Sequence, residues 1–105
     1  MNNYRIKWTK SAEKDRTEIG QYIARNLFAP MAAVKTVAAI NNAANNLSFM
    51  PHKRPIVDDK YWAKLGYRKL NVKNYTIFYV ICENSKIVYI KRIIHIRRNW
   101  QRALF

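Results

Sequence analysis

The 105-residue sequence is poor in cysteine, glycine and acidic residues, and each shortage excludes a class of protein. Its one cysteine, Cys82, cannot form an internal disulfide, which argues against a disulfide-stabilised secreted domain and favours a reducing compartment. With two glycines the chain has no glycine-rich phosphate loop, and it contains no G-x-S-x-G motif. No apolar run approaches the roughly 20 residues of a membrane span, and residues 1–10 lack the apolar core of a signal peptide. We therefore expect a cytoplasmic protein without a membrane partner.

Residues that bind metals and cofactors are also sparse. The two histidines, His52 and His95, and Cys82 do not show the spacing of a metal site, so we expect no metal and no cofactor. Cys82 lies in an apolar stretch that we expect to be the central strand of a sheet. Burial there would raise the pKa of its thiol and leave it inert.

The scarcity of acids leaves a large positive charge. Lys and Arg number 20 against 6 Asp and Glu, which gives a formal net charge of +14. Such a charge on a small body favours nucleic acid, a nucleoprotein such as the ribosome, or an acidic protein as the partner, although a basic surface without a partner is the alternative. The length allows one domain, residues 1–105, with one core.

Hydrophobic patterning predicts an α+β domain with the element order β-α-α-β-β-β. Residues 4–9 alternate apolar and polar side chains, which predicts a strand with Tyr4, Ile6 and Trp8 inward. Ser11 offers an N-cap for a helix over residues 12–27 that buries Ile19, Tyr22, Ile23 and Leu27, with Asp15 in its first turn. Pro30 suits the start of a second helix, which ends before Pro51. We expect the two helices to pack as a hairpin on one face of an antiparallel sheet.

Residues 67–95 are rich in aromatic and β-branched side chains, with polar breaks at 73–74 and 83–86, and predict a three-stranded antiparallel meander. Successive side chains of a strand point to opposite faces. The expected core face holds Leu70, Val72, Val88, Ile90 and Ile94. The expected open face holds Tyr67, Lys69, Tyr89, Lys91 and His95. In the preceding loop Tyr61 and Trp62 either plug the core or belong to a site, and residues 96–105 form a short helix or tail.

Two segments stand out in this element order: the run Tyr-Thr-Ile-Phe-Tyr at 75–79 and the ending Ile-Ile-His-Ile-Arg-Arg-Asn-Trp at 93–100. Both resemble the RelE/ParE superfamily of bacterial type II toxins. In that family the first helix tends to begin like residues 11–15 and to carry a Tyr-Ile pair such as 22–23. The second helix tends to close like residues 47–51, so the resemblance spans nearly the whole chain.

The resemblance implies a toxin of a plasmid-stabilisation system that a cognate antitoxin holds inactive. The antitoxin's flexible, often acidic segment would offset much of the +14 charge, and operator DNA would be bound only through the toxin–antitoxin complex. RelE-like members cut messenger RNA on the ribosome, whereas ParE-like members poison DNA gyrase. A third possibility is a non-toxic relative that acts only as an antitoxin-binding co-repressor.

Cleavage of RNA through its 2′-hydroxyl needs a proton acceptor, a proton donor, a cation on the phosphate and an aromatic platform for a base, but no metal. If the chain is such an endoribonuclease, the expected catalytic residues are His95, as acid or base, Arg97 and Lys69. His95 could instead be a structural residue bonded to a backbone carbonyl. The residues expected to contact the target are Arg68, Tyr89, Lys91, Arg98 and Trp100.

Two departures from the ribonuclease members favour gyrase as the target. Those members usually carry an arginine after the tyrosine that opens the central strand, whereas this chain has Thr76, which cannot stabilise a phosphorane. Many of them end in a catalytic tyrosine or a His-Tyr pair, whereas this chain has Trp100 and Phe105. We therefore favour gyrase, keep the ribosome as the alternative, and leave open whether the chain is an enzyme.

Overall fold

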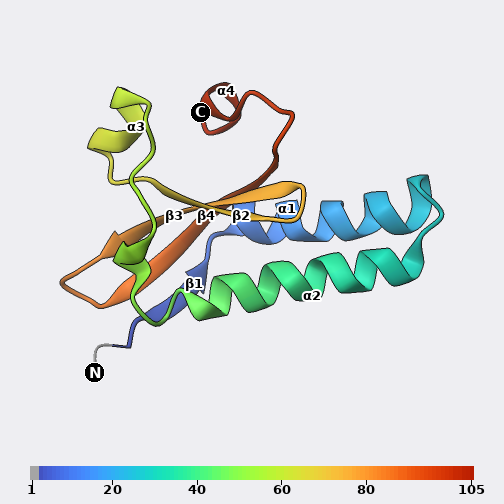
Figure 1. The fold of residues 1–105 in the computed structure, drawn as a ribbon, viewed down its shortest axis with the longest axis horizontal. Coiled ribbons are helices and arrows are strands. Elements are labelled where there is room, and N and C mark those ends of the chain that lie inside the picture. The colour runs from blue at the N-terminus through green and yellow to red at the C-terminus, as the bar shows by residue number, and fades with distance from the viewer. Residues whose placement is uncertain (1–2) are drawn as a thin grey trace.

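The protein folds into a four-stranded sheet with helices on both faces (Figure 1). The structure is a computed structural model that describes residues 3–105. The strands are β1 (Arg5–Trp8), β2 (Arg68–Val72), β3 (Tyr75–Cys82) and β4 (Ile87–His95). The helices are α1 (Lys10–Gln21), α2 (Pro30–Asn46), α3 (Lys60–Lys64) and α4 (Trp100–Ala103), with a π-helical turn η1 (Tyr22–Asn26) and a 3-10 turn η2 (Pro51–Lys53). Among residues 3–105, every helix is too short or too polar to span a membrane.

Strand β1 joins the edge of the sheet, but it runs parallel to β4. The order of the strands is β1-β4-β3-β2, and β2, β3 and β4 form the predicted antiparallel meander. The sheet is therefore mixed, and the expectation of an antiparallel sheet throughout is wrong. The helical hairpin and a long loop separate β1 from β2 in the chain, so no tight turn fixes the direction of β1.

Helix α1 begins earlier than predicted. Thr9 is its N-cap, because the Thr9 hydroxyl oxygen accepts a hydrogen bond of 3.2 Å from the N–H of Ala12. The same hydroxyl donates to the carbonyl of Ile90 at 2.9 Å, which ties the start of the helix to β4. Ser11, the expected cap, lies inside the first turn instead.

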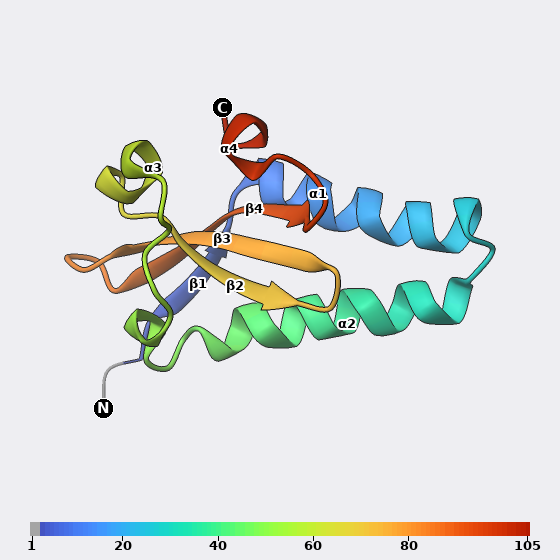
Figure 2. The same cartoon turned by 45° about the horizontal axis from the view of Figure 1, so that its top comes forward.

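The buried stripe of α1 also differs from the prediction. Asp15 is buried with Ile19 and Ile23, whereas Tyr22 is 51% exposed and Leu27 is 54% exposed. Helix α1 lies alongside α2 (Figure 2), and after Gln21 it continues as the π-helical turn η1, whose extra residue shifts the phase of the side chains that follow. A Cβ atom at Gly20 would lie 3.3 Å from Cγ2 of Val37, so glycine allows α2 to pack closely there.

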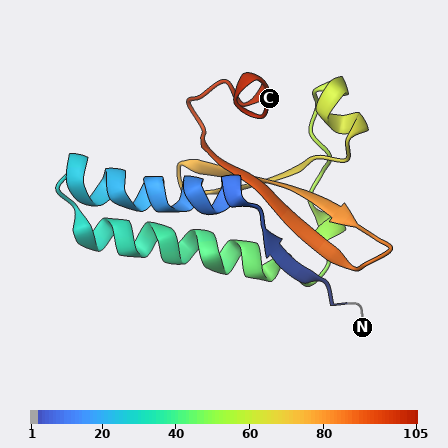
Figure 3. The ribbon, with the colours of Figure 1, turned by 180° about the vertical axis from the view of Figure 1, so that it is seen from behind.

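Two hydrophobic cores lie on opposite faces of the sheet. The first fills the space between the sheet and the α1–α2 hairpin, and includes Ala12, Ile19, Ile40, Ala44, Ile77 and Tyr79. The second lies under α3 and α4, on the other face, and includes Val57, Trp62, Tyr67, Phe78 and Ile94 (Figure 3). The helical hairpin thus covers one face as predicted, but the short helices cover part of the face that we expected to be open. Trp62 plugs this second core, while Tyr61 remains 54% exposed.

A bulge between β3 and β4 reverses part of the predicted side-chain pattern. Phe78 pairs with Arg92 and Tyr79 pairs with Ile90, so Lys91 is the extra residue on β4. Beyond this point Ile93 joins the first core and Ile94 joins the second. The prediction that Ile94 shares a face with Val88 and Ile90 is therefore wrong, because the alternation of side chains shifts by one residue at the bulge.

Candidate functional site

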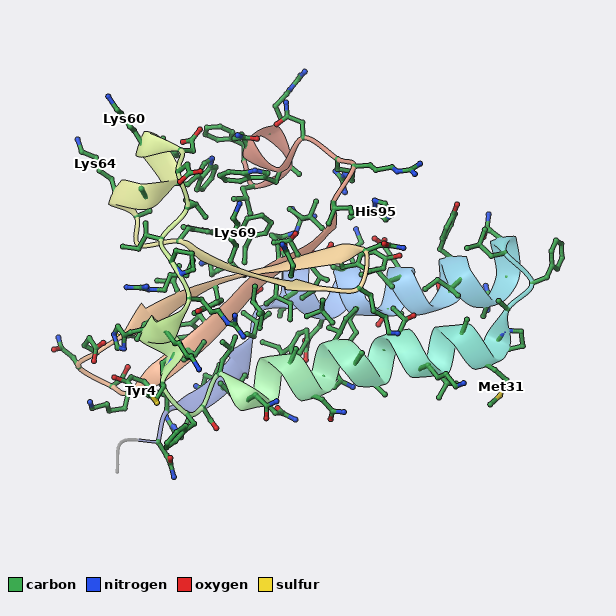
Figure 4. All side chains as sticks on the ribbon, viewed as in Figure 1. Tyr4, Met31, Lys60, Lys64, Lys69 and His95 are labelled. Atoms are coloured by element: carbon green, nitrogen blue, oxygen red, sulfur yellow. The ribbon has the colours of Figure 1, made fainter. Side chains whose placement is uncertain are left out.

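Two clefts meet at the C-terminal end of β4, and His95 and Arg98 line both of them. The first, the α1 cleft, has a volume of about 530 Å³ and is also lined by Asp15, Glu18, Ile19, Tyr22, Tyr75, Ile93 and Arg97. The second, the α4 groove, has a volume of about 260 Å³ and is also lined by Lys69, Asn71, Thr76, Phe78, Ile94, Ile96 and Trp100. Figure 4 labels His95 at the end of β4 and Lys69 on β2. The last residue of one strand therefore stands between two recesses.

The imidazole of His95 is oriented by the turn that follows β4. Its Nδ1 accepts a hydrogen bond of 3.1 Å from the backbone N–H of Arg97. The ring also packs edge-on against Tyr75, with the two ring centroids 5.2 Å apart. Because Nδ1 is the acceptor, Nε2 carries the proton of the neutral ring and can donate to a ligand. If His95 had only a structural role, we expected its ring to bond to a backbone carbonyl. It accepts a hydrogen bond from the backbone N–H of Arg97 instead.

The α4 groove brings Lys69, Arg98 and Trp100 together with His95. Trp100 stacks on Phe78, with the ring centroids 5.2 Å apart, so one face of the indole belongs to the second core. The hydroxyl of the buried Thr76 donates a 2.8 Å hydrogen bond to Oδ1 of Asn71. Thr76 and Asn71 are both neutral, so the positive charge of the groove comes from Lys69 and Arg98.

Arg97 lies in the α1 cleft and not in the α4 groove. There the cations that follow β4 share a cleft with two carboxylates of α1, Asp15 and Glu18. Burial is the main cause that raises the pKa of Tyr75, which also lines this cleft. Asp15, Glu18 and Tyr22 line this cleft although we did not expect them among the site residues from the sequence. Their spacings of three and four residues, which place them on one side of a helix, were the available signal.

Three of the residues that we expected to contact the target lie outside both clefts. Arg68 donates from Nη1 to the backbone carbonyls of His52 at 3.3 Å and Arg54 at 2.5 Å, so it holds the η2 turn against the sheet. Tyr89 precedes His95 by six residues, which corresponds to about 20 Å along a strand. Lys91 occupies the bulge. None of the three lines the α1 cleft or the α4 groove.

Cys82 is less buried than the sequence predicted. It is the last residue of β3 and is only partly buried. A hydrogen bond with the Ser85 side chain is the main cause that lowers the pKa of its thiol, so the expected rise on burial is wrong. Among residues 3–105 no group of three or more His, Cys, Asp and Glu side chains is arranged to hold a metal ion.

The fold is that of toxin–antitoxin proteins in two solved structures. One, described as the chromosomal ParDE toxin–antitoxin system from P. aeruginosa, superposes with a TM-score of 0.75 and 20% sequence identity, covering 92% of this chain and 100% of that one. The other, the toxin–antitoxin complex RelBE2 from Mycobacterium tuberculosis, gives a TM-score of 0.65 and 20% identity, covering 89% of this chain and 98% of that one. No curated protein matches the chain.

The family follows from the sequence match that accompanies this fold. Residues 6–100 match the family described as the ParE toxin of the type II toxin–antitoxin system parDE. The chain therefore belongs to the ParE toxin family, which confirms the resemblance to RelE/ParE toxins that the sequence motifs indicated.

Proposed function

We propose that this toxin inhibits DNA gyrase in the cytoplasm and that a cognate antitoxin neutralises it with an acidic segment. The observation that favours gyrase over the ribosome is the bonded pair Thr76 and Asn71 in the α4 groove, because both side chains are neutral. An RNA-cleaving site must aim a cation at the phosphorane, where negative charge accumulates in the transition state. Thr76 occupies the position where ribonuclease members carry an arginine, and its hydroxyl is bonded to Asn71 at 2.8 Å.

The proton-transfer groups of the groove support the same conclusion. Cleavage needs both a group that accepts a proton and a group that donates one. Among the side chains that line the α4 groove, His95 is the single imidazole, the side-chain type most suited to transferring a proton. Inhibition of an enzyme by contact needs no such pair, because exposed cations and an aromatic edge are sufficient for binding.

A ribosome-dependent ribonuclease is the second candidate, and one observation favours it. Lys69, His95 and Arg98 come from β2, β4 and the segment after β4, yet they line one groove of about 260 Å³. That set would supply a phosphate-binding cation and a proton donor. The two candidates differ in whether the imidazole transfers a proton, and this difference can be measured.

The proposed antitoxin partner is supported by charge and by the similar structures. The two solved structures are of a ParDE system and a RelBE2 complex, both toxin–antitoxin assemblies. A formal net charge of +14 makes the chain self-repulsive, and an acidic segment would offset much of it. The affinity for such a segment should therefore fall as the salt concentration rises.

A parallel assay on both targets tests the proposal. The purified chain should reduce supercoiling of a relaxed plasmid by gyrase with ATP, and should leave messenger RNA intact in a reconstituted translation reaction. The double variant R97A/R98A removes two exposed cations beside His95. If these cations contact gyrase, the variant should inhibit gyrase less than the wild type. Cleaved messenger without an effect on gyrase would overturn the proposal in favour of the ribonuclease. Expression of the chain alone should arrest growth, and normal growth would instead favour the non-toxic co-repressor.

A further inference from the structure

The side chain of Arg92 on β4 joins helices that belong to opposite faces of the sheet. Its guanidinium donates from Nε to Oδ2 of Asp15 at 2.6 Å and from Nη2 to Oδ1 of Asp15 at 3.1 Å. Its third nitrogen, Nη1, donates to the backbone carbonyl of Ala103 at 2.7 Å. Asp15 lies on α1 and Ala103 on α4, so one arginine connects the two layers.

The irregular edge of β4 makes this connection possible. Strand β1 pairs with β4 only as far as Ile90, and the bulge at Lys91 follows directly. Oδ2 of Asp15 accepts a hydrogen bond of 2.9 Å from the N–H of Ile93, so the carboxylate acts where a neighbouring strand would otherwise pair. The Asp15 carboxylate is therefore a fixed, charged partner for Nε and Nη2 of Arg92. The remaining nitrogen, Nη1, can then bond to α4.

Helix α4 depends on contacts with the rest of the protein. It has four residues, which is far too short for a helix that is stable alone. The last carbonyls of a helix have no partner within the helix, and a cation is favoured there. Arg92 supplies both a donor and a positive charge to that end of α4, while Trp100 stacks on Phe78 at the other end.

We propose that Arg92 is a positioning residue. By bonding Asp15 and Ala103 it fixes residues 96–104, and it thereby sets where Arg97, Arg98 and Trp100 stand around the α1 cleft and the α4 groove. This role in toxicity rests on the proposed function. The ordering of α4 by Arg92 is a property of the free protein and can be measured without any target.

Backbone NMR relaxation of the free chain tests the ordering. R92K keeps a positive charge that can pair with Asp15, but an ammonium group cannot reproduce the fork that bonds both Asp15 and Ala103. The amide order parameters of Ala103 and Leu104 should fall from about 0.85 to below about 0.6, while those of α2 stay unchanged. D15N, which leaves the arginine but removes its charged partner, should loosen the same residues. R102K, an exposed arginine on α4 itself, is the matched control and should change nothing.

Two results in this experiment would overturn the inference. One is an unchanged order parameter at Ala103 and Leu104 in R92K. The other is a loss of order spread equally over α2 and α4, because it would mean that Arg92 supports the whole fold and not the position of α4.

A gyrase assay on the same proteins tests the consequence. R92K should need about tenfold more protein than the wild type for equal inhibition, because misplaced contact groups bind less well. Loosened α4 residues with inhibition within twofold of the wild type would overturn the positioning role. If the wild type does not inhibit gyrase, the proposed target is wrong, and the NMR result alone then decides whether Arg92 orders α4.

Discussion

Thr76 and Asn71 stand directly opposite each other on β3 and β2, and the Thr76 hydroxyl donates to Oδ1 of Asn71 across 2.8 Å. T76V keeps the shape of the side chain but removes this donor. Because Asn71 is exposed and can bond to water instead, the free energy of unfolding should fall by only about 1 kcal/mol. Urea denaturation measures this change, with T17V at an exposed threonine of α1 as the control. A loss above about 3 kcal/mol would show that this bond has a larger structural role.

Asp15 should matter far more to stability, since it accepts three hydrogen bonds from Arg92 and Ile93 while its side chain is only 11% exposed. The bond with Asp15 is the main cause that raises the pKa of Arg92, so the guanidinium remains charged. D15N leaves that charge without its partner, and this change should lower the free energy of unfolding by about 3 kcal/mol. The urea midpoints of D15N and of D58N, at an exposed aspartate, provide the comparison. Equal midpoints for the two variants would contradict the expectation.

Glu83 predicts a pH dependence of stability. A hydrogen bond of 2.9 Å from the Tyr4 hydroxyl is the main cause that lowers the pKa of Glu83 below 4.5, and His52 adds to the effect. Between the folded and unfolded pKa values the unfolded chain binds more protons. The stabilisation is therefore present above the unfolded pKa, about 4.5, and is lost as the pH falls through the lower folded value. The difference in urea midpoint between the wild type and E83Q should be larger at pH 6 than at pH 3; a constant difference would contradict this.

Phe28 joins the two long helices with a φ of 52° and is 89% exposed. A positive φ is unfavourable for a side chain with a Cβ atom but not for glycine. F28G should therefore raise the free energy of unfolding by about 1 kcal/mol, which corresponds to a rise of about 4–8 °C in Tm for a domain of this size. F28A removes the same ring without relieving the backbone, so it should show no such gain. Calorimetry on the three proteins tests the effect, and equal Tm values for F28G and F28A would contradict it.

The sequence predicted those parts of the fold that depend on local periodicity. Strand β1, the two long helices and the β2–β3–β4 meander follow from patterns within about ten residues. The bulge at Lys91 could not be predicted, because it depends on how β4 pairs with β3 and on the carboxylate that Asp15 brings from α1. The cover of α3 and α4 over the second face was missed for the same reason, since short helices are stabilised by packing and not by their own sequence.

Some of the residues that line the candidate site could also be chosen from the sequence. His95, Lys69, Arg98 and Trp100 were selected by residue type, and the α4 groove brings them together. Arg68 has the same chemistry, but its guanidinium is bonded to the carbonyls of His52 and Arg54, and only the folded turn reveals this. The acids of the α1 cleft were missed because their role depends on which end of β4 lies against α1.

His95 gives the sharpest test of the mechanism, because Nδ1 is bonded to the Arg97 N–H and Nε2 remains for a ligand. H95Q keeps a hydrogen-bonding side chain but cannot transfer a proton near neutral pH. If the toxin acts by contact with gyrase, H95Q should inhibit within about threefold of the wild type, whereas R98A should inhibit about tenfold less, the effect of losing roughly 1.4 kcal/mol of contact energy. If the toxin is a ribonuclease, H95Q should lower the rate of messenger cleavage by about 10²- to 10⁴-fold. Dose–response curves for gyrase and single-turnover cleavage of messenger on the ribosome measure the two activities on the same preparations. The contact mechanism would be contradicted if H95Q lost most of its gyrase inhibition while R98A kept it. Inhibition would then depend on the proton-transfer group and not on the exposed charge.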